Sequence, residues 1–227
     1  MKALVTGGAR GIGAAIAERL RADGLEVVVL DRTQPCDIEF DLAADAELPD
    51  LGDVDVCVSN AAITTTIAPA HRMTLEQWQR DIDVNLTGAF RAIQACLPGM
   101  RERGFGRIVV ISSGAARSGL PGQAAYAASK AGLVGLTRTL AGENAHKGIT
   151  ANAILPGLVA TEAVLAMPPE ILEGARSSIP TGGLVEPREI ADLVAYLAGG
   201  RSRSITGEAI SVDGGIHLNT RSLTRRG

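Results

Sequence analysis

The sequence predicts a single α/β domain built on a doubly wound parallel sheet of about seven strands. Short runs of β-branched residues alternate with longer helical patterns, which is typical of parallel strands joined by crossover helices. The first run leads directly into a glycine-rich segment, TGGARGIG, that opens a helix. With 227 residues, 46% of them hydrophobic, the chain is long enough to bury one substantial core, and its 27 glycines allow many tight turns.

The strands follow in chain order from local composition. LEVVVL is a continuous apolar run and indicates a strand that is buried on both faces, whereas IEFD indicates only a short strand. VDVCVS, RIVVIS, ITANAIL and EAISV are the other β-branched runs after the first one. We therefore expect strands over residues 2–6, 25–30, 38–40, 54–59, 107–112, 149–155 and 208–212.

The helices follow from capping signals and longer apolar periodicity. Thr74 with Gln77 three residues later predicts a capping box, and Pro98 and Gly99 predict that the long helix it opens is interrupted or frayed near them. Pro187 fits the first turn of the last helix. We expect helices over residues 12–22, 74–103, 124–144 and 187–198, and a turn or two of helix over 43–48.

Charge and hydropathy exclude several kinds of partner. A formal net charge of −3 and a pI near 5.7 give no general attraction for nucleic acid or for an anionic membrane. The N-terminus lacks a secretory signal, and no stretch reaches roughly 18 uninterrupted apolar residues, so we expect a cytoplasmic, soluble protein. The basic tail is expected to be a solvated end rather than a binding arm; it holds Arg221, Arg225 and Arg226.

Cysteines and histidines indicate neither a disulfide framework nor a metal site. The three cysteines are odd in number and share no C-x-x-C spacing, and the three histidines are scattered. We expect buried or incidental thiols. The residues concerned are Cys36, Cys57, Cys96, His71, His146 and His217.

The segment TGGARGIG has the strand–loop–helix context of a Rossmann-type dinucleotide loop. Gly7 permits a tight turn, Gly11 lets the backbone approach a phosphate, and Gly13 lets the helix pack closely on the strand. The helix that begins near Ile12 would then place its positive end against the pyrophosphate.

Asp31, at the end of the second strand, favours NAD over NADP. A carboxylate there can accept hydrogen bonds from both adenosine ribose hydroxyls, whereas a 2′-phosphate would meet it as a like charge. Arg10 and Arg32 point the other way, because either could reach a 2′-phosphate. We weigh Asp31 above the arginines, since a strand end holds it in place while an arginine can swing into solvent.

The stretch YAASK predicts proton-transfer chemistry. Tyr126 and Lys130 are four residues apart and share a helix face, so an ammonium can lie beside a phenol. A nearby cation favours the phenolate, so we expect the lysine to bring the pKa of the tyrosine down toward working pH. Ser113, thirteen positions upstream of Tyr126, can supply a second donor to a carbonyl oxygen.

Taken together, these motifs resemble the short-chain dehydrogenases/reductases across nearly the whole chain. TGGARGIG, SNAA from Ser59, DVNLTGAF, ISSG, YAASK, PGLVAT and ITGEAISVDGG are similarly placed in that family. The resemblance implies a catalytic tetrad of Asn85, Ser113, Tyr126 and Lys130. It implies that Asn85 holds a kink in its helix and a water that relays protons, and that Lys130 binds the nicotinamide ribose.

The resemblance also implies where the cofactor would lie. Asn60 and Ala61 would lie beside its ribose, Val159 would offer backbone to the carboxamide and Thr161 its hydroxyl. The full set of expected cofactor contacts is Gly7, Arg10, Gly11, Ile12, Gly13, Asp31, Arg32, Asp41, Leu42, Asn60, Ala61, Tyr126, Lys130, Pro156, Gly157, Val159 and Thr161.

Three departures from the family pattern stand out. Only residues 33–37 separate the second strand from the third, where the family often has a helix, so we expect a more open adenine side. Ser59 and Ala62 replace the usual Asn and Gly of N-N-A-G. Gly183 stands where many members carry arginine.

The substrate is less well specified than the cofactor. The motif surroundings are most similar to 3-oxoacyl carrier-protein or CoA reductases, which usually take NADPH, and Asp31 disagrees with that cofactor. An NAD-linked enzyme that oxidises a secondary alcohol is therefore equally plausible. Ser113, Gln123 and Tyr126 are the expected substrate contacts, Lys147 could meet an acidic carrier, and residues 161–183 form an expected apolar lid.

Our leading interpretation is an NAD-dependent oxidoreductase that transfers hydride between nicotinamide and a secondary alcohol or ketone. The alternatives are an NADPH-dependent 3-oxoacyl reductase, a dinucleotide-sensing regulator without turnover, and a lyase or epimerase on the same fold. Apolar stripes on two helices suggest a homotetramer or homodimer, although core burial explains them equally. The stripes are Ile82, Leu86, Phe90 and Ile93, and Leu133, Leu136 and Leu140.

Overall fold

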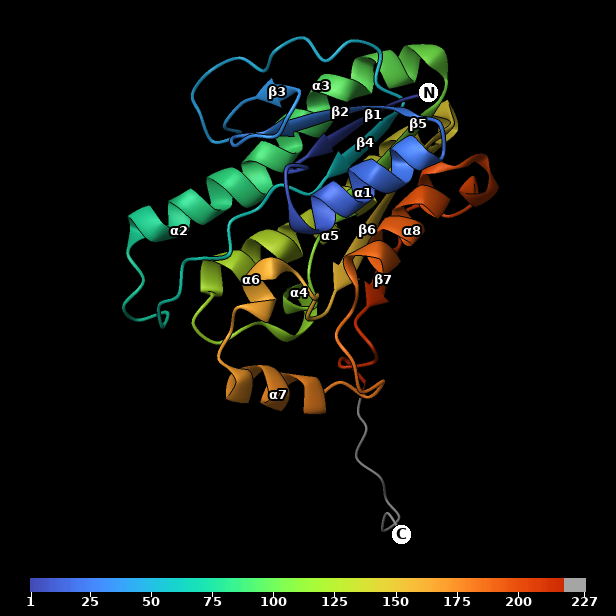
Figure 1. The fold of residues 1–227 in the computed structure, drawn as a ribbon. Coiled ribbons are helices and arrows are strands. Elements are labelled where there is room, and N and C mark those ends of the chain that lie inside the picture. Colours follow the sequence, from blue (N-terminus) through green and yellow to red (C-terminus); the bar gives the residue numbers. More distant parts are fainter. Residues whose placement is uncertain (219–227) are drawn as a thin grey trace.

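A seven-stranded parallel sheet forms the centre of the fold (Figure 1). The computed structural model describes residues 1–218. The sheet has the order β3-β2-β1-β4-β5-β6-β7, and every neighbouring pair is parallel. Its strands are β1 (Lys2–Thr6), β2 (Glu26–Asp31), β3 (Ile38–Glu39), β4 (Val56–Ser59), β5 (Gly106–Ile111), β6 (Ile149–Pro156) and β7 (Ala209–Val212). The predicted fold class is confirmed.

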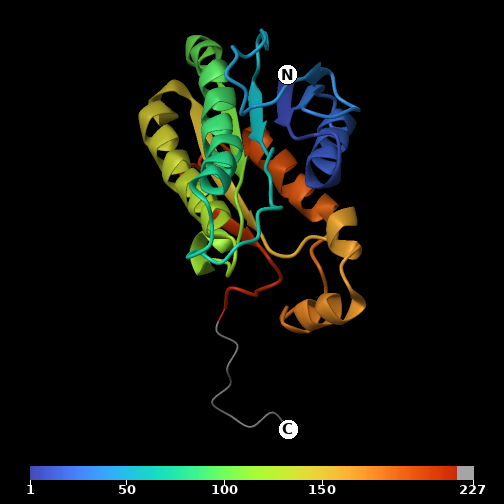
Figure 2. The same cartoon turned by 90° about the vertical axis from the view of Figure 1, so that its left-hand side faces the viewer.

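Two layers of helices cover the sheet, as Figure 2 shows. On one face α1 (Gly11–Ala22) and α8 (Pro187–Ala198) contribute buried side chains to a core with the strands. On the other face α3 (Gly88–Arg103) and α5 (Ala124–Asn144) build a second core. Because the strand order reverses direction beside β1, the loops after β1 and β4 diverge, which opens a crevice at the carboxyl ends of the strands.

The long helix expected over residues 74–103 is divided near its N-terminal end. Thr74 and Gln77 form the predicted capping box at the start of α2 (Leu75–Ile82). A π-helical turn, Asp83–Thr87, then joins α2 to α3. The expected interruption near Pro98 and Gly99 was wrong, because α3 continues through both residues to Arg103. The helix is distorted instead at the π-helical turn that contains Asn85.

Residues 43–48 form a turn and bends that continue into irregular chain, rather than the expected helix. The carbonyl oxygens of Ala44 and Ala46 accept hydrogen bonds from the Arg91 side chain, which holds the segment in this irregular conformation. Short helices that the sequence did not predict are α4 (Ala115–Ser118), α6 (Glu162–Leu165) and α7 (Pro169–Ser177). Single 3₁₀ turns occur at Ala145–Lys147 and Gly200–Ser202.

The segment expected to form a lid contains α6 and α7, and α7 stands away from the body of the fold beyond the carboxyl edge of the sheet (Figure 1). Within residues 1–218, no helix combines the length and the apolar character needed to cross a membrane. The predicted solvated tail with Arg221, Arg225 and Arg226 lies outside the described residues.

Candidate active site

The glycine-rich loop after β1 brings α1 into direct contact with the carboxyl end of the sheet. Gly7 has a positive φ of 66°, and a Cβ atom there would lie 2.6 Å from the Cα atom of Ala61. A Cβ atom on Gly13 would lie 2.0 Å from the carbonyl oxygen of Gly7 and 2.6 Å from Nδ2 of Asn60. Both positions therefore require glycine, because a side chain would push the helix or the neighbouring loop away.

The N-terminus of α1 offers free N–H groups to the crevice beside it. Arg10 is the N-cap residue, and its side chain makes no capping hydrogen bond. The N–H groups of a first helical turn have no intrahelical acceptor, and with the helix dipole they favour an anion. Gly7, Ile12 and Gly13 line the cleft at this point. The residues present therefore fit the pyrophosphate of a dinucleotide.

Thr6 and Asn60 hold the ends of β1 and β4 together. The hydroxyl of Thr6 accepts hydrogen bonds from the N–H groups of Asn60, at 3.0 Å, and Ala61, at 3.1 Å. In return Nδ2 of Asn60 donates to the carbonyl oxygens of Thr6, at 3.1 Å, and Gly7, at 2.8 Å. These four hydrogen bonds fix the start of the glycine-rich loop against the loop after β4. Thr6 was missed in the sequence, where it reads only as a strand residue before the loop.

A cleft of about 270 Å³ at this edge gathers most of the residues expected to bind the cofactor. The expected residues that line it are Gly7, Arg10, Ile12, Gly13, Asp31, Arg32, Asp41, Leu42, Asn60, Ala61 and Thr161. It is also lined by residues that were not among the expected cofactor contacts: Leu30, Thr33, Phe40, Ala62, Ile63, Thr64, Thr65 and Val84. Their only signal in the sequence is position, because each adjoins an expected residue or follows the end of a strand.

Six expected cofactor residues do not line this cleft: Gly11, Tyr126, Lys130, Pro156, Gly157 and Val159. Gly11 lies at its margin, since a Cβ atom there would be 3.5 Å from Cγ2 of Thr161. A Cβ atom on Gly157 would lie 2.8 Å from the Cα atom of Asp213, so this segment packs β6 against the turn after β7. Val159 is buried and forms an isolated bridge with Val185.

Asp31 ends β2 at the cleft and is fixed there by three hydrogen bonds. Its Oδ2 atom accepts from the N–H of Ala9 at 3.0 Å, and its Oδ1 atom accepts from the N–H and the hydroxyl of Thr33, both at 3.1 Å. Carboxylate oxygens have further lone pairs, so the group keeps acceptor capacity toward the cleft. Arg10 and Arg32 line the same cleft, which therefore holds groups of both charges.

Asn85 lies in the π-helical turn and is fully buried. Its Oδ1 atom accepts from the N–H of Ile63 at 2.8 Å, and its Nδ2 atom donates to the carbonyl oxygen of Ile63 at 3.0 Å. This reciprocal pair ties the distorted helix to the loop after β4, which lines the cleft. The expected helix distortion is therefore present, and both polar atoms of the side chain serve the loop.

Tyr126 and Lys130 lie one turn apart on α5, and Ser113 follows β5. Burial raises the pKa of Tyr126 above its ordinary value of 10, and a hydrogen bond with Ser113 opposes that rise. Lys130 is buried; its Nζ atom donates to the carbonyl oxygen of Ile111 at 2.8 Å, and burial lowers its pKa to about 8. The expectation that the lysine brings the pKa of the phenol down was wrong for this structure, because desolvation of the phenol outweighs the other contributions.

Gln123 connects the start of α5 to the cleft. Its Nε2 atom donates to the carbonyl oxygen of Thr64 at 2.6 Å, and Thr64 lines the cleft. One residue earlier, the carbonyl oxygen of Gly122 accepts from the N–H of Ala68 at 2.8 Å. The loop before α5 is thus bonded to the loop after β4. Gln123 thus links the start of α5, the helix that carries Tyr126, to a cleft that fits a dinucleotide.

Comparison with known proteins covers nearly the whole chain. Residues 35–217 match the family model described as Enoyl-(Acyl carrier protein) reductase, and residues 1–39 match the model described as short chain dehydrogenase. An acetoacetyl-CoA reductase of Shinella zoogloeoides is 46% identical over 235 residues, which cover 94% of this chain and 97% of the relative. A 3-oxoacyl-[acyl-carrier-protein] reductase of Mycobacterium tuberculosis is 40% identical over 228 residues, which cover 95% of this chain and 92% of the relative.

One solved structure is similar over the same span. It is described as a putative 2-deoxy-D-gluconate 3-dehydrogenase from Agrobacterium tumefaciens with bound NADP. It superposes with a TM-score of 0.88 at 32% identity, covering 95% of this chain and 96% of that chain.

Proposed function

The chain belongs to the short-chain dehydrogenase/reductase family, and from that membership we propose that it reduces the keto group of a 3-oxoacyl thioester with NADH. Its relatives include an acetoacetyl-CoA reductase and a 3-oxoacyl carrier-protein reductase that match almost end to end. The protein is an oxidoreductase that acts on keto or CH–OH groups. The thioester, the direction and the choice of NADH are the parts that we propose.

The relatives carry the proposed direction, because an acetoacetyl-CoA reductase and a 3-oxoacyl carrier-protein reductase are both named for the reduction, and the state of Tyr126 agrees with it. Because burial raises the pKa of this phenol, its hydroxyl keeps the proton at neutral pH. A protonated phenol is an acid, and reduction of a ketone needs an acid at the carbonyl oxygen, whereas oxidation of an alcohol needs a base there. The phenol therefore starts in the protonation state that reduction uses.

When bound, a reduced nicotinamide supplies hydride to the carbonyl carbon. Negative charge then develops on the carbonyl oxygen, where Tyr126 donates its proton and Ser113 donates a hydrogen bond. The Ser113 hydroxyl already interacts with Tyr126, so both donors converge on one place. Lys130 adds a positive charge next to the tyrosine ring. Asn85 keeps the adjoining loop in position through Ile63.

Asp31 supports NADH as the cofactor. Its three hydrogen bonds hold the carboxylate at the end of β2, where an adenosine ribose fits, and a 2′-phosphate would face it as a like charge. Arg10 and Arg32 could soften that repulsion. Their side chains can move into solvent, whereas the carboxylate is tied to Ala9 and Thr33.

The lid supports an acyl substrate. Leu165, Met167 and Ile171 are 53%, 38% and 60% exposed, although a soluble protein usually buries such side chains. They lie in and between α6 and α7, the helices that extend beyond the catalytic edge of the sheet. We expect these apolar side chains, with Gln123 at the mouth, to cover the acyl part of the thioester.

We also propose that the chain assembles as a homotetramer. Ile93, Leu133 and Leu140 of the apolar stripes are buried in the core of the single chain, so they need no partner. Phe90, in contrast, remains 41% exposed on α3. Light scattering should give a mass near four times 23.4 kDa, and a mass of 23.4 kDa would exclude assembly.

The direct test follows NADH absorbance with acetoacetyl-CoA, acetoacetyl carrier protein and a panel of simple ketones. We expect the thioesters to react fastest, and Tyr126→Phe to lower kcat by about 10²-fold or more. The matched control is Tyr196→Phe, because Tyr196 is the other tyrosine in the chain and lies 41% exposed on α8. This control should react like the wild type.

The outcomes separate the competing functions. Turnover of alcohols or sugars alone would make the protein a dehydrogenase of another substrate class. A protein that binds NADH tightly but shows no turnover that depends on Tyr126 would be a dinucleotide sensor. Either result would replace the proposed reductase.

A further inference from the structure

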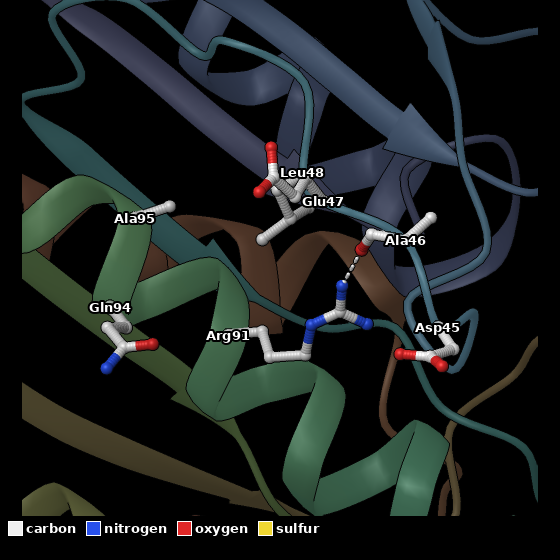
Figure 3. Close-up of a pocket in the computed structure, with 7 residues that line it drawn as sticks. All are labelled: Asp45, Ala46, Glu47, Leu48, Arg91, Gln94 and Ala95. Atoms are coloured by element: carbon white, nitrogen blue, oxygen red, sulfur yellow. Dashed lines mark hydrogen bonds between the residues drawn. The ribbon is translucent and has the colours of Figure 1, made fainter.

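A second cavity, of about 450 Å³, lies between α3 and the turn segment before β4 (Figure 3). Its lining combines residues of that segment with one face of the helix: Asp45, Ala46, Glu47, Leu48, Arg91, Gln94 and Ala95. Arg91 points from the helix toward the segment, while Gln94 points away from it, as Figure 3 shows. The cavity is separate from the cleft that fits the dinucleotide, but Arg91 connects the two.

Arg91 binds three backbone carbonyl oxygens of a segment that has no regular structure. Its Nη1 atom donates to Leu42 at 2.8 Å and to Ala44 at 2.7 Å, and its Nη2 atom donates to Ala46. These oxygens belong to alternate residues, and a guanidinium can serve all of them because its five N–H donors have a fixed planar arrangement. The charge also makes each bond stronger than a neutral one.

The segment that Arg91 holds continues into one wall of the cofactor cleft. Phe40, Asp41 and Leu42 line that cleft, and the Arg91 guanidinium lies 5.9 Å from the centre of the Phe40 ring. β3 neighbours β2 on the outer side of the sheet, so the residues after β3 lie beyond Asp31. If the adenosine ribose lies at Asp31, this wall faces the adenine.

Gly88, which lies on α3 like Arg91, packs closely against Leu42 in the same wall of the cleft. A Cβ atom on Gly88 would lie 2.8 Å from the Cβ atom of Leu42 and 3.4 Å from its carbonyl oxygen. Leu42 is buried at 4% exposure and is part of the core beneath α3. Gly88 and Arg91 are three residues apart and share a helix face. Leu42 is therefore fixed by close packing on one side and by a charged hydrogen bond on the other.

We propose that Arg91 is a positioning residue for the adenine end of the dinucleotide, acting through the backbone of Leu42, Ala44 and Ala46. The link between β2 and β3 is too short for the helix that would otherwise support this side of the cleft, and the segment after β3 forms only turns. The guanidinium takes over that support. The inference rests on dinucleotide binding by the proposed function, but not on the identity of the keto substrate.

The test measures binding of ADP-ribose, which carries the adenine and both phosphates but no nicotinamide, by isothermal titration calorimetry on the full chain. We expect Arg91→Ala to weaken the binding of ADP-ribose about tenfold or more and to raise the KM for NADH by the same factor. The kcat at saturating NADH and the KM for the keto substrate should stay within about twofold of wild type. The affinity of Arg91→Lys for ADP-ribose should lie between those of the wild type and Arg91→Ala, because an ammonium cannot reach all three carbonyl oxygens.

Two further variants keep the test decisive. Gly88→Ala should weaken the binding of ADP-ribose in the same way, because it displaces Leu42 while Arg91 remains. This variant takes the place of Arg91→Ala in the test if Arg91→Ala does not fold. Gln94→Ala is the matched control, since Gln94 lines the same cavity and points away from the segment. It should bind ADP-ribose like the wild type.

Unchanged ADP-ribose binding in both Arg91→Ala and Gly88→Ala would overturn the inference. A fall in kcat with unchanged affinity for ADP-ribose would overturn it as well, because it would indicate a general structural role. If the wild type bound neither ADP-ribose nor NADH, both this inference and the proposed function would fail. If it bound ADP-ribose but reduced no 3-oxoacyl thioester, only the proposed substrate would fail.

Discussion

The Nζ atom of Lys130 lies over the ring of Tyr126, 5.7 Å from the ring centroid. It is not the group that sets the acidity of the phenol, because burial raises the pKa of Tyr126 and lowers the pKa of Lys130 to about 8. At neutral pH the pair therefore consists of a neutral phenol and a lysine that is mainly protonated and reaches its midpoint of titration near pH 8. Its titration leads to two predictions.

The pH dependence of reduction should follow Lys130. We expect kcat/KM for the keto substrate to be level below about pH 8 and to fall above it, because the ammonium that stabilises developing negative charge is lost there. Since kcat/KM reports the free enzyme, the break should appear near the pKa of the unliganded lysine. Initial rates measured at constant ionic strength check this. A rate that stayed level well above pH 9 would show that the ammonium is not required.

The stability of the fold should also depend on Lys130. Its folded pKa is about 8, below the ordinary 10.5, so between these values the unfolded chain binds more protons and the stability contributed by this group rises with pH. Below pH 8 the full cost of burying the charge is present. Lys130→Met removes that cost, so its unfolding free energy relative to wild type should fall by up to about 3 kcal/mol between neutral pH and pH 10. Urea titrations at both pH values measure it, and a pH-independent difference would contradict the lowered pKa.

Asp31 should decide between NADH and NADPH. In Asp31→Asn the like charge that faces a 2′-phosphate is removed while the side chain keeps its size, so the kcat/KM ratio of NADPH to NADH should rise about tenfold or more. Steady-state rates with both cofactors measure the ratio. Asp37→Asn is the matched control, because Asp37 also accepts a backbone N–H near β2, that of Val29 at 2.8 Å, but lies outside the cofactor cleft. An unchanged ratio in Asp31→Asn would assign the selectivity to other residues.

Gly13 should tolerate no side chain. Gly13→Ala places a Cβ atom 2.0 Å from the carbonyl oxygen of Gly7, so either α1 or the loop must move. We expect a loss of about 1–3 kcal/mol in unfolding free energy and more than about tenfold in NADH affinity. Gly135→Ala on α5 is the control, because it meets nothing within 4 Å and lies in an exposed helix interior. It should stabilise the fold by about 0.5–1 kcal/mol, and equal behaviour of the two variants would contradict this account of Gly13.

Much of the fold could be read from local patterns. Each strand of the sheet has an apolar run whose composition predicts it, and the capping box at Thr74 is formed as expected. The secondary-structure prediction was wrong in a segment whose conformation depends on a residue far away in the chain. Residues 43–48 have a helical composition, but the segment is irregular, and the carbonyl oxygens of Ala44 and Ala46 accept from Arg91, which is more than forty positions away. Local periodicity carries no information about such a partner.

The chemistry of the site divides in the same way. The sequence by itself determined which residue types stand at the carboxyl ends of the strands: the glycines of the loop, Asp31, Ser113 and the pair on α5. These signals are readable because turns, helix faces and strand ends depend on neighbours within a few residues. Tertiary structure alone decided that Asn85 bonds to Ile63 and that Lys130 bonds to Ile111. It also decided which way each pKa moves, because burial is a property of the packed whole and competes with any charge that lies nearby in the chain.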